Sequence, residues 1–352
     1  MTTKKDIESA LMRGADTLRD TIDAANYKDY VLPVMFVKYL SDSYTDAVEE
    51  LSKQYSGIRL ERQKKYLPFM VAEGCSFYDL YQQRFADNIG QLMNAAMRQI
   101  EADNNQQLAG VLSAVDYNSE NALGTREHKN AILRDLLEDF EPLDLRPSAI
   151  EVKEGQVPAD VIGDAYEYMI GQFANMAGKK AGSFYTPAAV SEIMARIVDV
   201  QPGERVYDPT CGSGSLLIKA AKKQNSKEVS IYGQEVNGSS VAMAKMNMYI
   251  HEIRDAKIGW GDTLANPVFL DADGNLLLFD AIVANMPFSK DKWASGFNPG
   301  GESSGKGKKE FKMEASLDKF HRFDWGVPPA SKGDWAFLLH MIASLSVNGR
   351  IA

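Results

Sequence analysis

The chain has few of the residues that bind metals or form disulfides. Its 352 residues include two cysteines, Cys75 and Cys211, and four histidines. Two cysteines cannot build a disulfide framework or a four-cysteine zinc site, and the histidines show no paired spacing. The composition therefore argues against a metal centre and favours a reducing compartment, which we expect to be the cytoplasm.

Long apolar runs are also missing. No stretch reaches the about 18 apolar residues of a membrane-spanning helix, and residues 1–8 lack the apolar segment of a signal peptide. Hydrophobic residues at 45% and charged residues at 25% are globular values, and the length predicts about two domains. We therefore expect a soluble protein that is not secreted.

The chain has fewer positively charged than negatively charged side chains. The chain has 39 Lys and Arg against 48 Asp and Glu, for a formal net charge of −9. A protein that binds nucleic acid alone usually carries a basic excess, because it must neutralise phosphates. Either nucleic acid is not the substrate, or another component supplies most of the positive charge.

The first part of the chain has apolar residues at helical spacing, which predicts a helical domain. Two groups show this spacing: Ile7, Leu11, Leu18 and Ile22, then Val31, Met35, Phe36, Tyr39 and Leu40. Further helices are predicted over 85–100 and 129–140. Residues 146–158 have the Pro, Gly and charge content of a linker. We therefore expect a helical domain at 1–150, for partner or DNA contacts, and a second domain at 151–352.

The second part alternates between strands and helices. A helix is predicted over 160–176, and the short apolar runs that follow predict strands at 205–208, 229–235, 257–262 and 279–285, with helices at 215–223 and 239–253. This alternation predicts an α/β fold, with a mostly parallel sheet and helices on both faces. Ligands of such sheets bind at the carboxyl ends of the strands, so the residues there are the first candidates.

The first two predicted strands end in residues that suit a nucleoside. Asp208 is followed by Gly212 and Gly214, which let the chain turn tightly before a helix N-terminus. Glu235 ends the next strand, at the place where a carboxylate can accept hydrogen bonds from both ribose hydroxyls. The Gly-x-Gly pair alone fits a simple turn equally well, and Leu217 stands where a dinucleotide fingerprint has its third glycine. Together the two features favour a nucleoside-bearing cofactor.

The third and fourth strand ends suit bases that carry an amino group. Asp262 can accept a hydrogen bond from an adenine amine, although an Asp there more often caps a turn or helix. The fourth strand ends in Asn285-Met286-Pro287-Phe288, which offers an amide oxygen, a backbone carbonyl and an aromatic face. Those three groups are what holding a flipped-out base requires. Taken alone, the tetrapeptide would more often be a turn that ends a strand.

The four strand ends, in this order, resemble the S-adenosyl-L-methionine (AdoMet)-dependent amino-methyltransferases of DNA, whose signature is Asn-Pro-Pro-Phe/Tyr. Residues 182–187 resemble the further AdoMet motif that precedes the glycine loop, and Thr186 and Pro187 are predicted as N-cap and first residue of a helix. Residues 26–42, 164–168 and 334–338 look like the modification subunit, HsdM, of type I restriction-modification systems. The resemblance covers essentially the whole chain. It implies N6-methylation of adenine in the DNA of a bacterium or archaeon.

The resemblance also assigns roles. It implies a Rossmann-like AdoMet-dependent methyltransferase domain in which Glu235 holds the ribose and Asp262 the adenine of the cofactor. Asn285 and the Met286 carbonyl accept the N6 hydrogens of a target adenine stacked on Phe288, and transfer is direct. Cys211 is interpreted as a small loop residue rather than a nucleophile. The residues implied in cofactor binding are Ser183, Phe184, Tyr185, Thr186, Pro187, Ala188, Asp208, Thr210, Cys211, Gly212, Ser213, Gly214, Ser215, Glu235, Asp262, Thr263 and Leu264, and those in catalysis are Asn285, Met286, Pro287 and Phe288.

The family implies partners: DNA reached through a specificity subunit (HsdS), a second copy of HsdM, and the restriction subunit (HsdR). Such partners would explain how an acidic chain reaches DNA. Two departures from the family are visible. Met286 stands where the family usually has Pro, and the chain ends at 349–352, where the family continues into further strands. We therefore expect a methyltransferase sheet whose C-terminal strands are missing.

A Gly- and Lys-rich stretch follows the tetrapeptide. With Lys306, Lys308, Lys309 and Lys312 it can close over DNA, or it can be a solvated surface loop. Three other functions remain open at this point. They are a methyltransferase that acts on protein or RNA, an NAD-dependent oxidoreductase, which the missing third glycine disfavours, and an assembly subunit that binds AdoMet without catalysing transfer.

Overall fold

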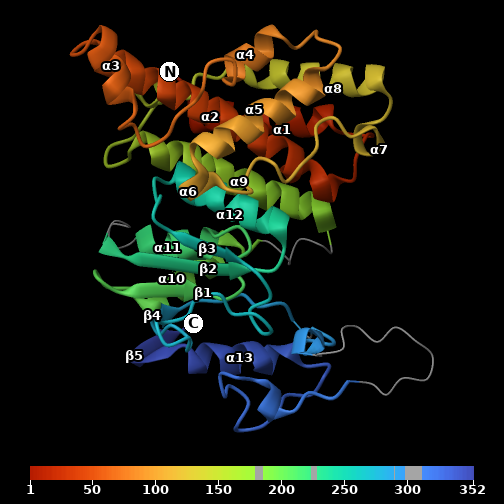
Figure 1. Cartoon of the computed structure of the whole chain (residues 1–352), viewed down its shortest axis with the longest axis vertical. Helices are drawn as coiled ribbons and strands as arrows, with labels where there is room; N and C mark the ends of the chain where they lie inside the picture. The colour runs from red at the N-terminus through yellow and green to blue at the C-terminus, as the bar shows by residue number, and fades with distance from the viewer. Residues whose placement is uncertain (179–184, 223–227, 289, 298–310) are drawn as a thin grey trace. The chain divides into compact units, whose positions relative to one another are not determined.

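The chain folds into two units, shown in the computed structural model of Figure 1, which describes residues 1–178, 185–222, 228–288, 290–297 and 311–352. One unit comprises Met1–Ala181 and Lys245–Glu252, and the other comprises Gly182–Ala244 and Ile253–Ala352. Within the described residues, none of the helices combines the length and apolar character that a membrane crossing requires.

The first unit is built from helices, as the apolar spacing predicted. The buried side chains Ile7 and Leu11 on α1, and Val31 and Met35 on α2, belong to its core. The described helices are α1 (Lys4–Thr17), α2 (Tyr27–Ser52), α3 (Gly57–Lys64), α4 (Phe77–Gln82), α5 (Ile89–Asp103), α6 (Asn105–Leu108), α7 (Glu120–Leu123), α8 (Arg126–Phe140) and α9 (Pro158–Ala177), with short 3-10 turns η1 (Ala24–Asn26) and η2 (Pro147–Ala149).

The end of the helical unit differs from the expectation. The sequence places a domain boundary at residue 150, whereas the unit continues through α9, which packs against α1. The first part of the expected linker is also fixed in place. Ile150 is buried, and Thr2 donates to the Ala149 carbonyl at 2.8 Å and accepts from the Glu151 amide at 2.9 Å. Residues 149–151 are therefore part of the packed helical unit, because the N-terminal strand-like segment pairs with them.

A buried ion pair lies inside the helical unit. Lys38 Nζ donates to Asp42 Oδ2 at 2.5 Å, one turn further along α2, and both side chains are fully buried. The Tyr78 hydroxyl donates to the other Asp42 oxygen at 2.7 Å, and the Leu145 amide donates to Oδ2 at 2.7 Å. Residues 26–42, which carried part of the family resemblance, thus contribute a buried ion pair to a hydrogen-bonded network that connects three segments of the fold.

The second unit is a parallel five-stranded sheet in the order β3-β2-β1-β4-β5, with helices between the strands, which confirms the predicted fold class. Figure 1 shows the strands in this order, with α13 beside β5. The elements are α10 (Ala188–Val198), β1 (Arg205–Asp208), α11 (Ser215–Lys222), β2 (Ser230–Glu235), α12 (Gly238–Ile250), β3 (Lys257–Trp260), β4 (Phe279–Ile282), α13 (Gly333–Ala343) and β5 (Leu345–Ile351), with 3-10 turns η5 (Ser295–Phe297) and η6 (Ala315–Leu317). The second half of α12, from Lys245 onward, is assigned to the helical unit.

The strand order creates a point at which the chain reverses direction across the sheet. After β1 the chain moves outward through β2 and β3, and it then returns to the other side of β1 as β4. Ligands of open parallel sheets bind outside the carboxyl ends of the strands at such a switch point. Here β1 ends at Asp208, and β4 ends three residues before Asn285.

Candidate functional site

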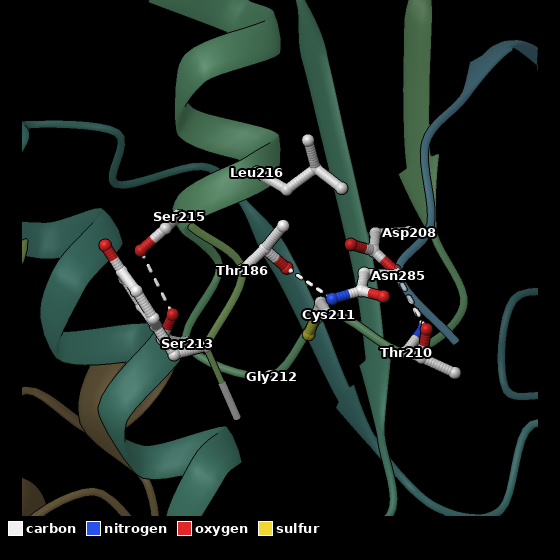
Figure 2. A pocket seen from close by; sticks show the side chains of 10 residues that line it. Thr186, Asp208, Thr210, Cys211, Gly212, Ser213, Ser215, Leu216 and Asn285 are labelled. Atoms are coloured by element: carbon white, nitrogen blue, oxygen red, sulfur yellow. Dashed lines mark hydrogen bonds between the residues drawn. The ribbon is translucent and has the colours of Figure 1, made fainter. Parts of the chain in front are cut away.

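The loop after β1 turns sharply into α11 because of two glycines. Gly212 has φ +51° and Gly214 has φ +76°, a left-handed conformation that strains residues with a Cβ atom. The Gly214 amide donates to the Cys211 carbonyl at 2.7 Å, and α11 starts at the next residue. Figure 2 shows this loop, with the hydroxyls of Ser213 and Ser215 joined by a hydrogen bond. The loop therefore presents a helix N-terminus at the carboxyl end of β1.

Two buried carboxylates border the loop. Asp208 Oδ1 accepts from the Thr210 amide at 2.8 Å (Figure 2). Glu235 Oε2 accepts from the Gly212 amide at 3.0 Å, and Oε1 accepts from the Asn237 amide at 2.8 Å. Burial raises the pKa of Asp208 to about 8 and also raises the pKa of Glu235. Since each carboxylate oxygen has two acceptor positions, Glu235 can bind its two amides and still accept from a ligand.

The raised pKa of Asp208 has a consequence for stability. Its folded pKa of about 8 exceeds the reference value of 3.8, so the folded protein binds this proton more tightly than the unfolded chain does. The contribution to the free energy of unfolding therefore falls as pH rises from about 4 to about 8. Asp208→Asn removes this titration, and we expect its melting temperature to exceed that of the wild type by several degrees at pH 8 but to approach it at pH 5.

Thermal unfolding of the ligand-free protein between pH 5 and pH 9 measures this difference. The exposed Asp273→Asn is the matched control, and its profile is expected to follow the wild type. Parallel profiles for Asp208→Asn and the wild type would contradict the assignment of a raised pKa to Asp208.

Asn285 is oriented by Thr186. Asn285 Nδ2 donates to Thr186 Oγ1 at 3.2 Å, and Figure 2 shows the two side chains pointing toward each other. Within the described residues the amide oxygen, Oδ1, forms no hydrogen bond. The prediction that Thr186 is a helix N-cap is wrong, because Pro187 has the N-cap position and no side chain caps α10. The hydroxyl of Thr186 contacts Asn285 instead.

Two pockets meet at Asn285. A narrow cleft of about 20 Å³ is lined by Asn285 together with Tyr185, Thr186, Asp208, Thr210, Cys211, Gly212, Ser213, Ser215 and Leu216. A cavity of about 370 Å³ is lined by Asn285 together with Pro209, Thr210, Glu235, Val236, Asn237, Asp262, Thr263, Pro287, Lys290 and Phe337. The larger cavity has the size of a small-molecule site. The predicted residues from four strand ends therefore converge on one region, as the sheet topology requires.

Several lining residues were not predicted as site residues. Leu216, Pro209, Val236 and Asn237 are direct neighbours of predicted positions, so a wider window around each strand end would have included them. Lys290 and Phe337 are different, because they come from the loop after the tetrapeptide and from α13. Phe337 lies in residues 334–338. This stretch contributed to the family resemblance, but the sequence analysis assigned no role to its residues.

Leu264, predicted in cofactor binding, lines neither pocket. Its side chain is fully buried and packs in an apolar cluster with Trp293, Phe323 and Phe337, and its role at a cofactor stays a prediction. The turn after Asp262 directs Leu264 away from the cavity and into the core. Of the other predicted residues, Ser183 and Phe184 lie outside the described residues, as do Lys306, Lys308 and Lys309, and Pro187, Ala188, Gly214, Met286 and Phe288 line neither pocket.

Met286 and Phe288 point in different directions from the backbone that joins them. The Met286 side chain is half-buried and packs against two apolar clusters of the second unit. Phe288 is 83% exposed, which is unusual for a large aromatic side chain. Cys211 is buried, and burial raises the pKa of its thiol well above the usual range, which agrees with a structural role rather than a nucleophilic one.

The sheet order, the glycine loop after β1, the acidic residue that ends β2 and the one that follows β3 define a methyltransferase fold. The chain belongs to the N-6 DNA methylase family, whose family model matches residues 157–352. Residues 7–140 match the model of the HsdM N-terminal domain. The predicted membership of the HsdM type is thereby confirmed.

Two curated relatives match almost the whole chain. The MjaVIII methylase subunit of a type I restriction enzyme from Methanocaldococcus jannaschii is 29% identical over 342 residues, which cover 93% of this chain and 53% of the relative. The MpnII methylase subunit of a type I restriction enzyme from Mycoplasma pneumoniae is 29% identical over 386 residues, which cover 98% of this chain and 66% of the relative. The chain thus spans between about half and two thirds of these relatives' lengths.

Solved structures show the same fold. The crystal structure of a type I restriction-modification methyltransferase subunit from Streptococcus thermophilus is similar with a TM-score of 0.75 and 28% identity, covering 99% of this chain and 74% of that one. A modification subunit of a type I restriction enzyme from Vibrio vulnificus, at 19% identity and a TM-score of 0.60, shares the fold.

Proposed function

We propose that this chain is a DNA adenine N6-methyltransferase subunit of a type I restriction-modification complex. The observation that supports this best is the position of Asn285. Its amide lies where the cleft and the cavity meet, Thr186 binds its NH2 group, and its Oδ1 is available as an acceptor. An acceptor at that point suits an exocyclic amine that must face the donor of the group to be transferred.

The residues around the pockets fit AdoMet, which supplies an activated methyl group when it is bound. Glu235 would accept hydrogen bonds from the ribose hydroxyls, and Asp262 would accept from the adenine amine, since both line the larger cavity. The amides at the start of α11 and the hydroxyls of Ser213 and Ser215 would hold the methionine carboxylate. The cleft has a volume of only about 20 Å³, so it must widen for that end of the ligand.

The tetrapeptide would hold the target adenine after it leaves the duplex. Asn285 Oδ1 and the Met286 carbonyl would accept the two N6 hydrogens, and Phe288 would stack on the base. Pro287 restricts Met286 to extended conformations, and the Met286 side chain is packed in the core, so the loop keeps its shape although the usual Pro is absent. Positioning of the amine would supply most of the rate acceleration.

Partners follow from the same proposal. The relatives are named as methylase subunits of type I restriction enzymes, and we propose that this chain likewise acts with a specificity subunit, a second copy of itself and a restriction subunit. A net charge of −9 then no longer conflicts with a DNA substrate, because the specificity subunit would supply the DNA contacts.

Transfer of tritiated methyl groups from AdoMet to unmethylated DNA tests this function. With the cognate specificity subunit we expect incorporation, and nucleoside analysis of the DNA should give N6-methyladenine. Without that subunit incorporation should fall by at least about 1,000-fold, the lower end of the range by which sequence-specific binding commonly exceeds non-specific binding. Incorporation into RNA or protein alone would support the other methyltransferase functions, and AdoMet binding with complex formation but no transfer would support the assembly subunit.

A further inference from the structure

Arg322 forms a buried network beside the larger cavity. Its side chain and that of Asp318 are each 1% exposed, and the two groups pair through Nε and Nη2 at 2.8 to 3.1 Å. The guanidinium also donates to the carbonyl oxygens of Thr263 at 3.3 Å and Leu264 at 2.6 Å. Its Nη1 lies 3.1 Å from Nδ1 of His340. One side chain thus holds two consecutive carbonyls of the segment that follows Asp262.

That segment decides where the Asp262 carboxylate points. Asp262 Oδ1 accepts from the amides of Leu264 at 2.9 Å and Ala265 at 3.3 Å, and the Asp262 carbonyl accepts from the Asn266 amide at 2.6 Å. Oδ1 is therefore occupied by the turn. Oδ2 lies 4.0 Å from Lys290 Nζ, and both residues line the cavity. A shift of the turn would move Oδ2 with it.

The turn is held from the opposite side by Gln234, which is fully buried on β2. Its Nε2 donates to the carbonyls of Gly261 at 3.2 Å and Asn266 at 2.9 Å. Gln234 therefore fixes the two ends of residues 261–266, and Arg322 fixes the middle. Without Arg322, the carbonyls of residues 263 and 264 would be buried without their donor, which would destabilise this conformation of the turn.

His340 connects Arg322 to the sheet. Burial, together with the charge of Arg322, lowers the pKa of His340 to about 3, so the ring is neutral. A guanidinium can only donate, so Nδ1 of His340 accepts and the ring proton is on Nε2. Nε2 lies 3.2 Å from the Tyr207 hydroxyl of β1. Arg322 is thus fixed to α13 and β1, and it does not depend on the ligand for its position.

We propose that Arg322 is a positioning residue that makes the cavity selective for a cofactor whose base carries an amine. It does so by holding the 263–264 carbonyls so that Asp262 Oδ2 faces that base. Arg322 lines neither pocket and contacts no ligand itself. The inference rests on the proposed function, because it takes the cavity to be the cofactor site.

A pair of ligands that differ only at the exocyclic amine isolates this role. S-Adenosyl-L-homocysteine has the amine, and its 6-deamino analogue, in which the base is unsubstituted purine, has a hydrogen atom in its place, which cannot donate to Asp262. Calorimetric titration of the full chain should show the wild type binding the adenosine compound at least about tenfold more tightly, as expected for a hydrogen bond to a charged acceptor. In Arg322→Lys this ratio should fall below about threefold, because an ammonium lacks the planar fork that reaches both carbonyls and Asp318.

Arg350→Lys is the matched control. Arg350 also binds a carboxylate, that of Glu204 at 2.5 and 2.9 Å, and two carbonyls, those of Val198 at 2.7 Å and Asp199 at 3.3 Å. It lines neither pocket, so its variant should keep the wild-type ratio. If Arg322→Lys does not fold, the double variant Arg322→Gln with Asp318→Asn replaces it, since it removes both buried charges together and is expected to lower the ratio equally.

The outcomes separate this inference from the proposed function. A wild type that binds neither compound would contradict the proposed function. A wild type that binds both equally would overturn the inference while leaving a cofactor site in place. An Arg322 variant that binds both compounds more weakly by the same factor, so that the ratio is kept, would show a merely structural role and overturn the inference as well.

Discussion

Asn285→Ala is expected to reduce the rate of methyl transfer by at least about 100- to 1,000-fold, the loss that follows when one preorganised hydrogen-bonding group is removed from a reacting centre. The affinity for AdoMet should change little, because the carboxylates and amides that would bind the cofactor belong to other residues. Among the described residues, Thr186 is the only hydrogen-bond partner of the Asn285 side chain, so its removal breaks no hydrogen bond of the turns after β1, β2 and β3. Single-turnover transfer and calorimetric titration with AdoMet measure the two quantities separately.

The control for this experiment is Asn275→Ala, an exposed Asn in a surface turn of the same unit, which should keep the wild-type rate. If Asn285→Ala lost AdoMet binding and methyl transfer together, Asn285 would be a cofactor residue and the roles proposed for the two pockets would be wrong.

Lys38→Ala is expected to lower the free energy of unfolding by about 3 to 5 kcal/mol, because it leaves the Asp42 carboxylate buried without its cation. Both side chains are fully buried, and Asp42 also binds Tyr78 and the Leu145 amide, so no water can replace the ammonium without disturbing α2 and α4. Urea unfolding monitored by circular dichroism gives the difference.

Lys53→Ala is the matched control, since Lys53 forms an ion pair with Glu50 on the same helix, but at the surface. Its unfolding midpoint should equal that of the wild type, because exposed pairs contribute little. Replacing Lys38 and Asp42 together, by Met and Asn, should recover part of the lost stability, because it removes both buried charges while the Asn side-chain oxygen can still accept from the Leu145 amide. Similar midpoints for Lys38→Ala and Lys53→Ala would contradict the structural role of the buried pair.

Much of the second unit could be predicted from local pattern. Four of the strands are short apolar runs, and their existence and order follow from the chain itself. The helix α12 is buried on nearly all sides rather than on one face, and α13 and β5 were not predicted from the pattern. The predicted ends of the strands were less accurate than their positions along the chain. The predicted strands at 257–262 and 279–285 end at Trp260 and Ile282, because Asp262 and Asn285 lie in turns that begin where pairing with the neighbouring strand stops. A sequence pattern does not show where that pairing ends.

The residues of the candidate site likewise fall into those that could be predicted from the sequence and those that could not. Residues next to strand ends, such as Asp208, Glu235 and Asn285, were predicted because a parallel sheet brings strand ends together. Phe337 and Lys290 were not, since their place at the cavity depends on how α13 and the loop after β4 pack. The direction of the Leu264 side chain could not be predicted for a related reason. Its neighbours Asp262 and Thr263 line the cavity, while the turn that follows puts Leu264 among Trp293 and Phe323.

The sequence by itself determined the α/β class, the order of the first four strands and the chemical types at their ends, because periodicity and turn residues are properties of neighbours in the chain. It also showed a deficit of positive charge, so that the proposed binding of DNA needs positive charge from another component. Only the tertiary structure decided that Thr186 orients Asn285 instead of capping a helix, and that Arg322, far along the chain, holds the turn of Asp262. Those contacts join residues separated by many positions, and hydrogen-bond geometry between such residues exists only after the chain has folded.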